Sequence, residues 1–165
     1  MLPGWAENLK RLRSVGARRG RHSPAYAALK GKLSRGSVLL DIGCGDSKDR
    51  IIAASRGIVA YGVDLFPPLS RSTERFVRAD ARRLPFSASS VDAVICQAMI
   101  SLIPPDDRYG FYCEVARVLK IGGWFSIVFY SLVDGWRVTP EHENQRIAAS
   151  GLKYVHSGLY QKEIS

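Results

Sequence analysis

Cysteine is scarce in this chain of 165 residues, which holds only Cys44, Cys96 and Cys113, with no CxxC pair and no Cys/His cluster. Three isolated cysteines argue against a disulfide framework and a structural zinc site, so we expect reduced thiols and no metal. No apolar run approaches the ~20 residues of a membrane span, and the first residues lack the apolar core of a secretory signal. We therefore expect a cytoplasmic protein with no membrane partner.

Acidic residues are nearly absent from the first forty positions, where nine Lys or Arg residues accompany a single acid, Glu7. That stretch carries +8 of the chain's net charge of +9, so the remainder is almost neutral. We interpret residues 1–22 as a basic, solvated, flexible leader and residues 23–165 as one domain. The alternatives are nucleic-acid binding through residues 10–21 and, as a minor option, an organelle transit peptide.

The rest of the chain has the composition of a globular domain, with 46% hydrophobic residues overall. Apolar runs bounded by glycine, proline or acids predict five strands, at residues 38–41, 58–64, 75–79, 91–96 and 124–130. Helical spacing and helix-start signals predict helices at 25–33, around 51–56, at 106–120 and at 140–149. In the helix around 51–56, Ile51, Ile52 and Ala54 form the expected apolar face. Residues 152–164 alternate as a strand pair, with Ser157-Gly158 as a two-residue hairpin turn.

Strands and helices therefore alternate along the chain, which predicts an α/β fold. We expect a doubly wound, mostly parallel, Rossmann-like sheet with helices on both faces and an abbreviated C-terminal antiparallel hairpin. In this architecture ligands bind beyond the carboxyl ends of the strands. Several chemistry-bearing residues follow strands and should converge there: Asp41, Gly43, Gly45, Asp64, Asp80 and Cys96.

The first predicted strand runs into a glycine turn, Asp41-Ile42-Gly43-Cys44-Gly45. Glycines at this spacing let backbone N–H groups approach a ligand without an intervening Cβ. A helix starting after the turn would direct its free N–H groups into the same space, which suits an anion or a ligand carboxylate. Packing alone is an equally good explanation of this turn. Asp64, nineteen residues beyond Gly45, adds a carboxylate at the offset where dinucleotide folds bind ribose hydroxyls.

Four segments carry a family resemblance that spans about residues 33–131. Leu40-Asp41-Ile42-Gly43-Cys44-Gly45 resembles the first motif of class I S-adenosylmethionine-dependent methyltransferases, and Tyr61-Gly62-Val63-Asp64 resembles their second. The stretch 79–86, Ala-Asp-Ala-Arg-Arg-Leu-Pro-Phe, resembles their third. Residues 117–123 look like the helix end and glycine pair that lead into the fifth strand. The resemblance is strongest to the broad group acting mostly on small molecules, the type 11-like domains.

This resemblance implies S-adenosylmethionine as the cofactor and assigns roles along the chain. The glycine turn with Asp41 and Cys44 would pack against the methionine part, and Asp64, with Leu65 beside it, would accept from the ribose hydroxyls. Asp80 would accept from the adenine amino group, beside the Ala81 backbone. The remaining candidates are Cys96 and Gln97, which would line the methionine side, and Tyr26 and Ser101, which at most position the acceptor.

The implied reaction is in-line transfer of a methyl group to an unidentified, small-molecule acceptor. No catalytic base is visible, because no histidine follows the fourth strand, and Ser47 replaces the third glycine of the first motif. The alternatives are an RNA methyltransferase or RNA-binding protein that uses the basic leader, and a non-catalytic binding module. Nicotinamide cofactors are disfavoured, because Lys48 stands where their pattern needs a further glycine.

Overall fold

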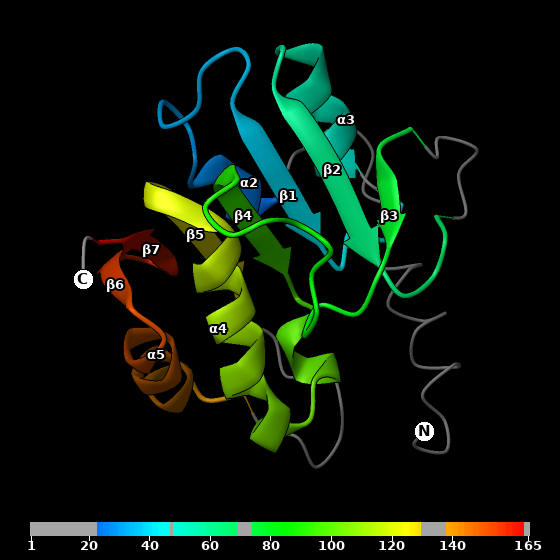
Figure 1. The fold of residues 1–165 in the computed structure, drawn as a ribbon. Coiled ribbons are helices and arrows are strands. Elements are labelled where there is room, and N and C mark those ends of the chain that lie inside the picture. The colour runs from blue at the N-terminus through cyan, green and yellow to red at the C-terminus, as the bar shows by residue number, and fades with distance from the viewer. Residues whose placement is uncertain (1–22, 47, 69–73, 130–137, 164–165) are drawn as a thin grey trace.

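The computed structural model describes residues 23–46, 48–68, 74–129 and 138–163, and these residues form one mixed sheet of seven strands (Figure 1). In spatial order the strands run β3-β2-β1-β4-β5-β7-β6. Their bounds are β1 Val38–Ile42, β2 Val59–Asp64, β3 Phe76–Arg78, β4 Val91–Gln97, β5 Leu119–Val128, β6 Leu152–His156 and β7 Leu159–Lys162. The first five pair in parallel, and β7 pairs antiparallel with β5 and β6. The predicted α/β fold with its C-terminal antiparallel hairpin is confirmed.

Helices cover both faces of this sheet, as Figure 1 shows. They are α2 Pro24–Ala27, α3 Lys48–Ser55, α4 Arg108–Val118 and α5 Pro140–Ala149, with short 3-10 turns η1 Ile100–Leu102 and η2 Pro105–Asp107. Side chains that alternate along each strand enter different cores. Leu39 joins a cluster with Ala25 and Ala53 from α2 and α3, whereas its neighbour Leu40 joins a cluster with Phe111 and Ile147 from α4 and α5.

The C-terminal hairpin depends on one glycine. Ser157 and Gly158 both have positive φ, 40° and 75°, as a two-residue turn between right-twisted strands requires. A Cβ on Gly158 would lie 2.3 Å from the Ile127 carbonyl oxygen, so a larger residue would push β7 away from β5. The predicted hairpin is therefore confirmed at its turn.

Two helix predictions are wrong in detail. The helix expected at 25–33 is a single turn, α2, after which the chain makes successive turns and Gly31 adopts φ +74°. In α3 the buried side chains are Asp49, Arg50 and Ala53, while Ile51 is 48% exposed. The predicted apolar face was thus rotated, because polar contacts at the N-terminus of α3 set which side of this helix faces the sheet.

The boundary between α4 and β5 also differs from the prediction. The helix ends at Val118, because Leu119 already has extended backbone angles and pairs with Val91. Gly122 and Gly123 lie in a bulge within β5 and do not terminate the helix, and regular pairing with β4 resumes at Trp124.

Two sequence-based predictions lie outside the described residues: the leader at 1–22 and the effect of Ser47 in the glycine turn. Within the described ranges, no helix is long and apolar enough to cross a membrane. Across those same ranges, no group of three or more His, Cys, Asp or Glu side chains is arranged to hold a metal ion.

Candidate functional site

The glycine turn after β1 is held against β2 at the carboxyl edge of the sheet. The Gly43 N–H donates to the Val63 carbonyl at 2.8 Å, and the Cys44 N–H reaches the same oxygen at 3.3 Å. Gly43 has φ +71°, and a Cβ there would lie 2.5 Å from Cγ of Met99, which follows β4. Only glycine fits this position, because it satisfies both the backbone angle and the close approach of Met99.

Gly45 and Asp64 form the contact that organises the turn. The Gly45 N–H donates to Asp64 Oδ2 at 3.0 Å, while the Phe66 N–H donates to Oδ1 at 3.1 Å. Each carboxylate oxygen has a second lone pair, so Asp64 can accept one further hydrogen bond at each oxygen. Gly45 has φ +48°, and apart from its chain neighbours no heavy atom of the residues that the structure describes lies within 4 Å of the place its Cβ would take. The turn is therefore open on the side of Gly45 and carries an acceptor pair next to the opening.

Asp41 is buried behind this turn, with its side chain 4% exposed. Burial raises the pKa of Asp41 to about 8, with further contributions from the nearby Asp49 and Asp64 carboxylates, and Arg50 opposes the rise. Three carboxyl groups thus surround the start of α3. Of these three groups, the Asp49 and Asp64 carboxylates favour a positively charged ligand group.

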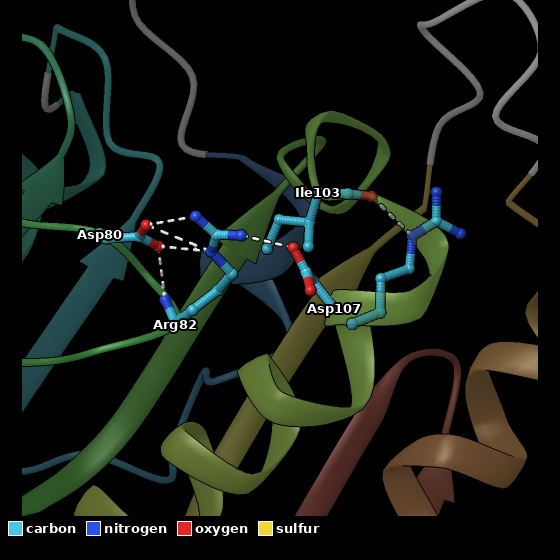
Figure 2. Close-up of polar contacts among 5 residues, drawn as sticks. Asp80, Arg82, Ile103 and Asp107 are labelled. Carbon is cyan, nitrogen blue, oxygen red and sulfur yellow. Dashed lines mark hydrogen bonds and ion pairs between the residues drawn. The ribbon is translucent and has the colours of Figure 1, made fainter. Parts of the chain in front are cut away.

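Asp80 follows β3, and its carboxylate is engaged by Arg82 (Figure 2). Asp80 Oδ1 accepts from the Arg82 backbone N–H at 2.9 Å and from Nε at 3.0 Å, and Oδ2 accepts from Nη2 at 2.7 Å. The Arg82 guanidinium holds the pKa of the Asp80 carboxyl below its usual range. Nη1 of Arg82 also pairs with Asp107, at the end of η2. The loop after β3 is thereby joined to the segment that precedes α4.

The start of α2 reaches the same edge of the sheet. The Ser23 N–H donates to Asp49 Oδ1 at 2.8 Å, and the Ala25 N–H donates to Gln97 Oε1 at 3.3 Å. Gln97 ends β4, next to β1, and is half-buried. The residue that follows the basic leader therefore lies against the N-terminus of α3.

The predicted site residues fall into two groups. At the carboxyl edge the structure brings together those on or after β1, β2, β3 and β4: Asp41, Gly43, Cys44, Gly45, Asp64, Leu65, Asp80, Ala81 and Gln97. Leu65 is 44% exposed and its carbonyl accepts from Arg78 Nε, while Ala81 is half-buried and packs against the core.

The second group is buried in the protein. Cys96 is fully buried in the core cluster that contains Phe111, and burial raises its thiol pKa to about 12. Tyr26 packs in the opposite core with its ring below Arg56, at 5.7 Å. Ser101 is fully buried, and its hydroxyl donates to the Ala98 carbonyl at 3.4 Å. The side chains of these three residues are therefore packing elements of this structure.

Four residues of the site were not predicted: Asp49, Arg82, Met99 and Asp107. Asp49 follows the first motif and Arg82 lies within the third, so their charge close to the glycine turn and to Asp80 was a usable signal. No local signal indicates Asp107, because its partner Arg82 lies 25 residues earlier. Met99 likewise meets Gly43 only through the parallel pairing of β1 with β4.

Residues 40–127 of the chain match the family model described as "Methyltransferase domain". The chain belongs to the methyltransferase domain family. In family and fold the chain is similar to the class I, S-adenosylmethionine-dependent methyltransferases, and the predicted resemblance is confirmed. The match begins in β1 and ends in β5, so it contains the glycine turn, Asp64 and Asp80.

Two similar curated proteins come from Arabidopsis thaliana. Cycloartenol-C-24-methyltransferase is 31% identical over 136 residues, which is 74% of this chain and 39% of the relative. A tRNA (carboxymethyluridine(34)-5-O)-methyltransferase is 31% identical over 113 residues, which is 66% of this chain and 28% of the relative. The methyltransferase domain described here thus spans between a quarter and two fifths of these two relatives.

A solved structure shares the fold over almost the whole methyltransferase domain. It is the 1,6-didemethyltoxoflavin-N1-methyltransferase of Burkholderia thailandensis, with bound 1,6-didemethyltoxoflavin and S-adenosylhomocysteine. The TM-score is 0.76 at 21% identity, with 99% of this chain and 92% of that chain covered.

The site of this chain fits the family's cofactor in two respects. The open side of Gly45 and the spare lone pairs of Asp64 suit a ribose with two hydroxyl donors. The Asp49 and Asp64 carboxylates, beside the buried Asp41, suit a ligand that carries an ammonium and a sulfonium group.

Proposed function

We propose that this domain binds S-adenosylmethionine at the carboxyl edge of β1, β2 and β4 and transfers its methyl group to a small-molecule acceptor. The observation that carries the proposal is the hydrogen bond between Gly45 N–H and Asp64, which fixes a carboxylate beside an open glycine turn. The bond links residues nineteen positions apart. It holds the glycine turn after β1 against the end of the adjacent strand β2, which is where we place the ribose.

Each residue of the edge has a role in this proposal. Asp64 accepts from the two ribose hydroxyls, with Leu65 covering the exposed side, and Asp80 accepts from the adenine amino group beside Ala81. The glycine turn and Asp41 take the methionine end, and Gln97 lies where the methyl group is presented. Gln97 also fixes the start of α2, so it links this position to the N-terminal side of the domain.

Bound S-adenosylmethionine supplies a methyl group on a positively charged sulfur, which is already activated for transfer. The domain's own task is to align the acceptor and to exclude water, and alignment supplies on the order of 7–11 kcal/mol. No dedicated base is needed for an acceptor that is already nucleophilic. The two described histidines, His142 and His156, are exposed on α5 and β6, and neither lies on β1, β2 or β4.

The decisive experiment is calorimetric titration with S-adenosylhomocysteine. Asp64→Asn keeps the shape of the side chain but replaces one acceptor oxygen by a donor, so we expect about a ten- to hundredfold loss of affinity. Asp106→Asn is the matched control, because Asp106 is exposed before α4 and lies outside the proposed site. Equal affinities of the wild type and Asp64→Asn would contradict the assigned site, and preferential binding of NAD would replace the cofactor.

A nucleic-acid acceptor is the second candidate. It is favoured by the tRNA methyltransferase among the relatives and by the contact of Ser23 with Asp49, which brings residue 23 to the site edge. Formation of S-adenosylhomocysteine in cell extract, with and without ribonuclease treatment, separates the two acceptors. Turnover that survives ribonuclease supports a small molecule, whereas turnover abolished by ribonuclease supports RNA.

A further inference from the structure

Arg82 lies between two carboxylates that belong to different segments of the chain, as Figure 2 shows. Asp80 follows β3, and Asp107 ends η2, just before α4. One guanidinium edge, Nε and Nη2, meets Asp80 as a fork, and the remaining nitrogen, Nη1, pairs with Asp107. The side chains of Arg82, Asp80 and Asp107 are 42%, 33% and 44% exposed, so the bridge lies at the surface of the site.

The Asp107 end of this bridge is anchored in the protein. Its neighbour Arg108 points the other way, donating from Nε to the Ile103 carbonyl at 3.0 Å and from Nη1 to Glu143 at 2.8 Å. The Arg108 and Glu143 side chains are each only 1% exposed. Asp107 is thus carried by a segment that a buried ion pair ties to α5, and Arg82 connects the Asp80 loop to it.

The bridge also limits how Asp80 can meet a ligand. Oδ1 of Asp80 accepts from both the backbone N–H and Nε of Arg82, which uses its two lone pairs. Oδ2 accepts from Nη2 at 2.7 Å, and the contact from Nε to Oδ2 is longer, at 3.2 Å. One well-directed acceptor position is therefore left, on Oδ2. An adenine amino group needs one such acceptor.

We propose that Arg82 is a positioning residue for the adenine of the cofactor. It holds the Asp80 carboxylate in one orientation, and through Asp107 it fixes the Asp80 loop against the segment that follows β4. This inference rests on the proposed function, since it concerns the same cofactor. The inference adds Arg82 to the residues of the site. In this proposal Arg82 contacts Asp80 and acts on adenine only through Asp80.

Adenine selectivity gives a readout that a purely structural role of Arg82 would not change. Calorimetric titration with S-adenosylhomocysteine is compared with titration with S-inosylhomocysteine, whose hypoxanthine has a carbonyl where adenine has its amino group. We expect the wild type to prefer the adenine compound. In Arg82→Ala we expect about a five- to fiftyfold loss of affinity for S-adenosylhomocysteine and a smaller change for the inosyl compound, so that the preference narrows.

Arg83→Ala is the matched control, because Arg83 is also exposed and neighbours Arg82, and among the causes that lower the Asp80 pKa it contributes only its charge and no side-chain hydrogen bond. Arg82→Lys keeps the charge but loses the fork geometry, so we expect an intermediate affinity. A cycle with Asp80→Ala tests whether Arg82 acts through Asp80, because Arg82→Ala should cause little further loss in that background. The melting temperature of the ligand-free Arg82→Ala variant should stay close to that of the wild type, since exposed ion pairs contribute little to stability.

The link to α4 is tested separately by Asp107→Asn, with Asp106→Asn as its control. We expect Asp107→Asn to weaken S-adenosylhomocysteine binding by about two- to fivefold, because Arg82 keeps its paired hydrogen bonds to Asp80 but loses its ion pair with Asp107. If the wild type does not bind S-adenosylhomocysteine, the proposed function fails together with this inference. If the wild type binds, and Arg82→Ala binds with the same affinity and the same adenine preference, the inference alone is overturned. Unchanged binding by Asp107→Asn would overturn the tether to α4.

Discussion

At the scale of single residues, the two glycines of the turn differ in what surrounds them. A Cβ on Gly43 would overlap the Met99 side chain, whereas a Cβ on Gly45 would enter open space. Both residues have positive φ, which costs a non-glycine residue about 1–2 kcal/mol. Gly43 is therefore constrained by packing and backbone angle together, and Gly45 by backbone angle and by access to the ligand.

We predict that Gly43→Ala and Gly45→Ala separate stability from binding. Gly43→Ala should lower the free energy of unfolding by about 2–4 kcal/mol, from backbone strain and overpacking. Gly45→Ala should lower it by about 1–2 kcal/mol but weaken S-adenosylhomocysteine binding at least as much, because the methyl group fills the open side of the turn. Urea denaturation and calorimetry measure the two quantities. A larger loss of stability in Gly45→Ala would contradict the role of Met99.

Asp41 makes the stability of the domain depend on pH. Its pKa is raised to about 8 in the folded protein from its ordinary value of 3.8, mainly by burial. Between these values the unfolded chain has released the proton that the folded chain retains. This contribution to stability is therefore complete below about pH 4 and is lost as pH rises through about 8.

We predict that Asp41→Asn removes this dependence. Relative to the wild type, the variant should gain stability as pH rises from 5 to 8, by on the order of a few kcal/mol, because asparagine has no proton to release. Urea denaturation at pH 5, 6.5 and 8 measures the difference, with Asp106→Asn as an exposed control. A constant difference between the wild type and Asp41→Asn across this range would contradict the burial of a protonated carboxyl group.

At the scale of secondary-structure elements, α4 and α5 are joined by a buried polar network. Glu143 accepts from Arg108 Nη1, from the Tyr112 hydroxyl and from Arg146 Nη1, each at 2.8 Å. Burial, followed by the Glu143 charge, raises the pKa of Tyr112 above its ordinary value, so Tyr112 stays protonated and donates. The network sits behind the segment that carries Asp107, and it fixes where α4 begins.

We predict that Glu143→Ala destabilises the domain by about 3–5 kcal/mol, because Arg108 would lose its buried counter-charge. The exposed neighbour Glu141, on the same helix, provides the control: Glu141→Ala should change stability by less than about 0.5 kcal/mol. Thermal or urea denaturation measures both variants. Similar stabilities of Glu143→Ala and the wild type would show that water replaces the carboxylate readily, which would argue against a tightly packed network.

At the scale of the whole molecule, charge is distributed unevenly. The net charge of the chain is +9, and most of it belongs to the first forty residues. The acidic residues Asp49 and Asp64 lie near the carboxyl edge, beside the buried Asp41, and Ser23 contacts that edge through Asp49. The leader and the proposed site are therefore adjacent along the chain and opposite in charge.

We predict that deleting residues 1–22 leaves the affinity for S-adenosylhomocysteine unchanged. If the leader binds RNA, the full chain should show RNA binding that falls steeply with salt, with a slope of about 0.7 per phosphate contact, and the deletion should abolish it. If the leader is only solvated, the full chain and the deletion variant should bind RNA equally weakly. Filter binding at several salt concentrations distinguishes the outcomes, and we favour the second.

The sequence by itself determined the order and type of the strands, the glycine turn and the positions of Asp64 and Asp80 at strand ends. These features are local, because a short apolar run predicts a strand and the residues of a motif lie only a few positions apart. The same information placed the C-terminal hairpin at Ser157-Gly158, because two-residue turns need residues that tolerate positive φ. The sequence was a poorer guide to the length of α2 and to the buried face of α3, because contacts with other elements set how long α2 is and which side of α3 faces the sheet.

Only the tertiary structure decided which side chains of the site are open and which are packed. Cys96, Tyr26 and Ser101 are buried because neighbouring elements cover them, and their own sequence surroundings do not show this. The pairs Arg82–Asp107 and Arg108–Glu143 join residues 25 and 35 positions apart. Their contacts depend on how the crossovers place α4 and α5 on one face of the sheet, a long-range arrangement that no local pattern encodes.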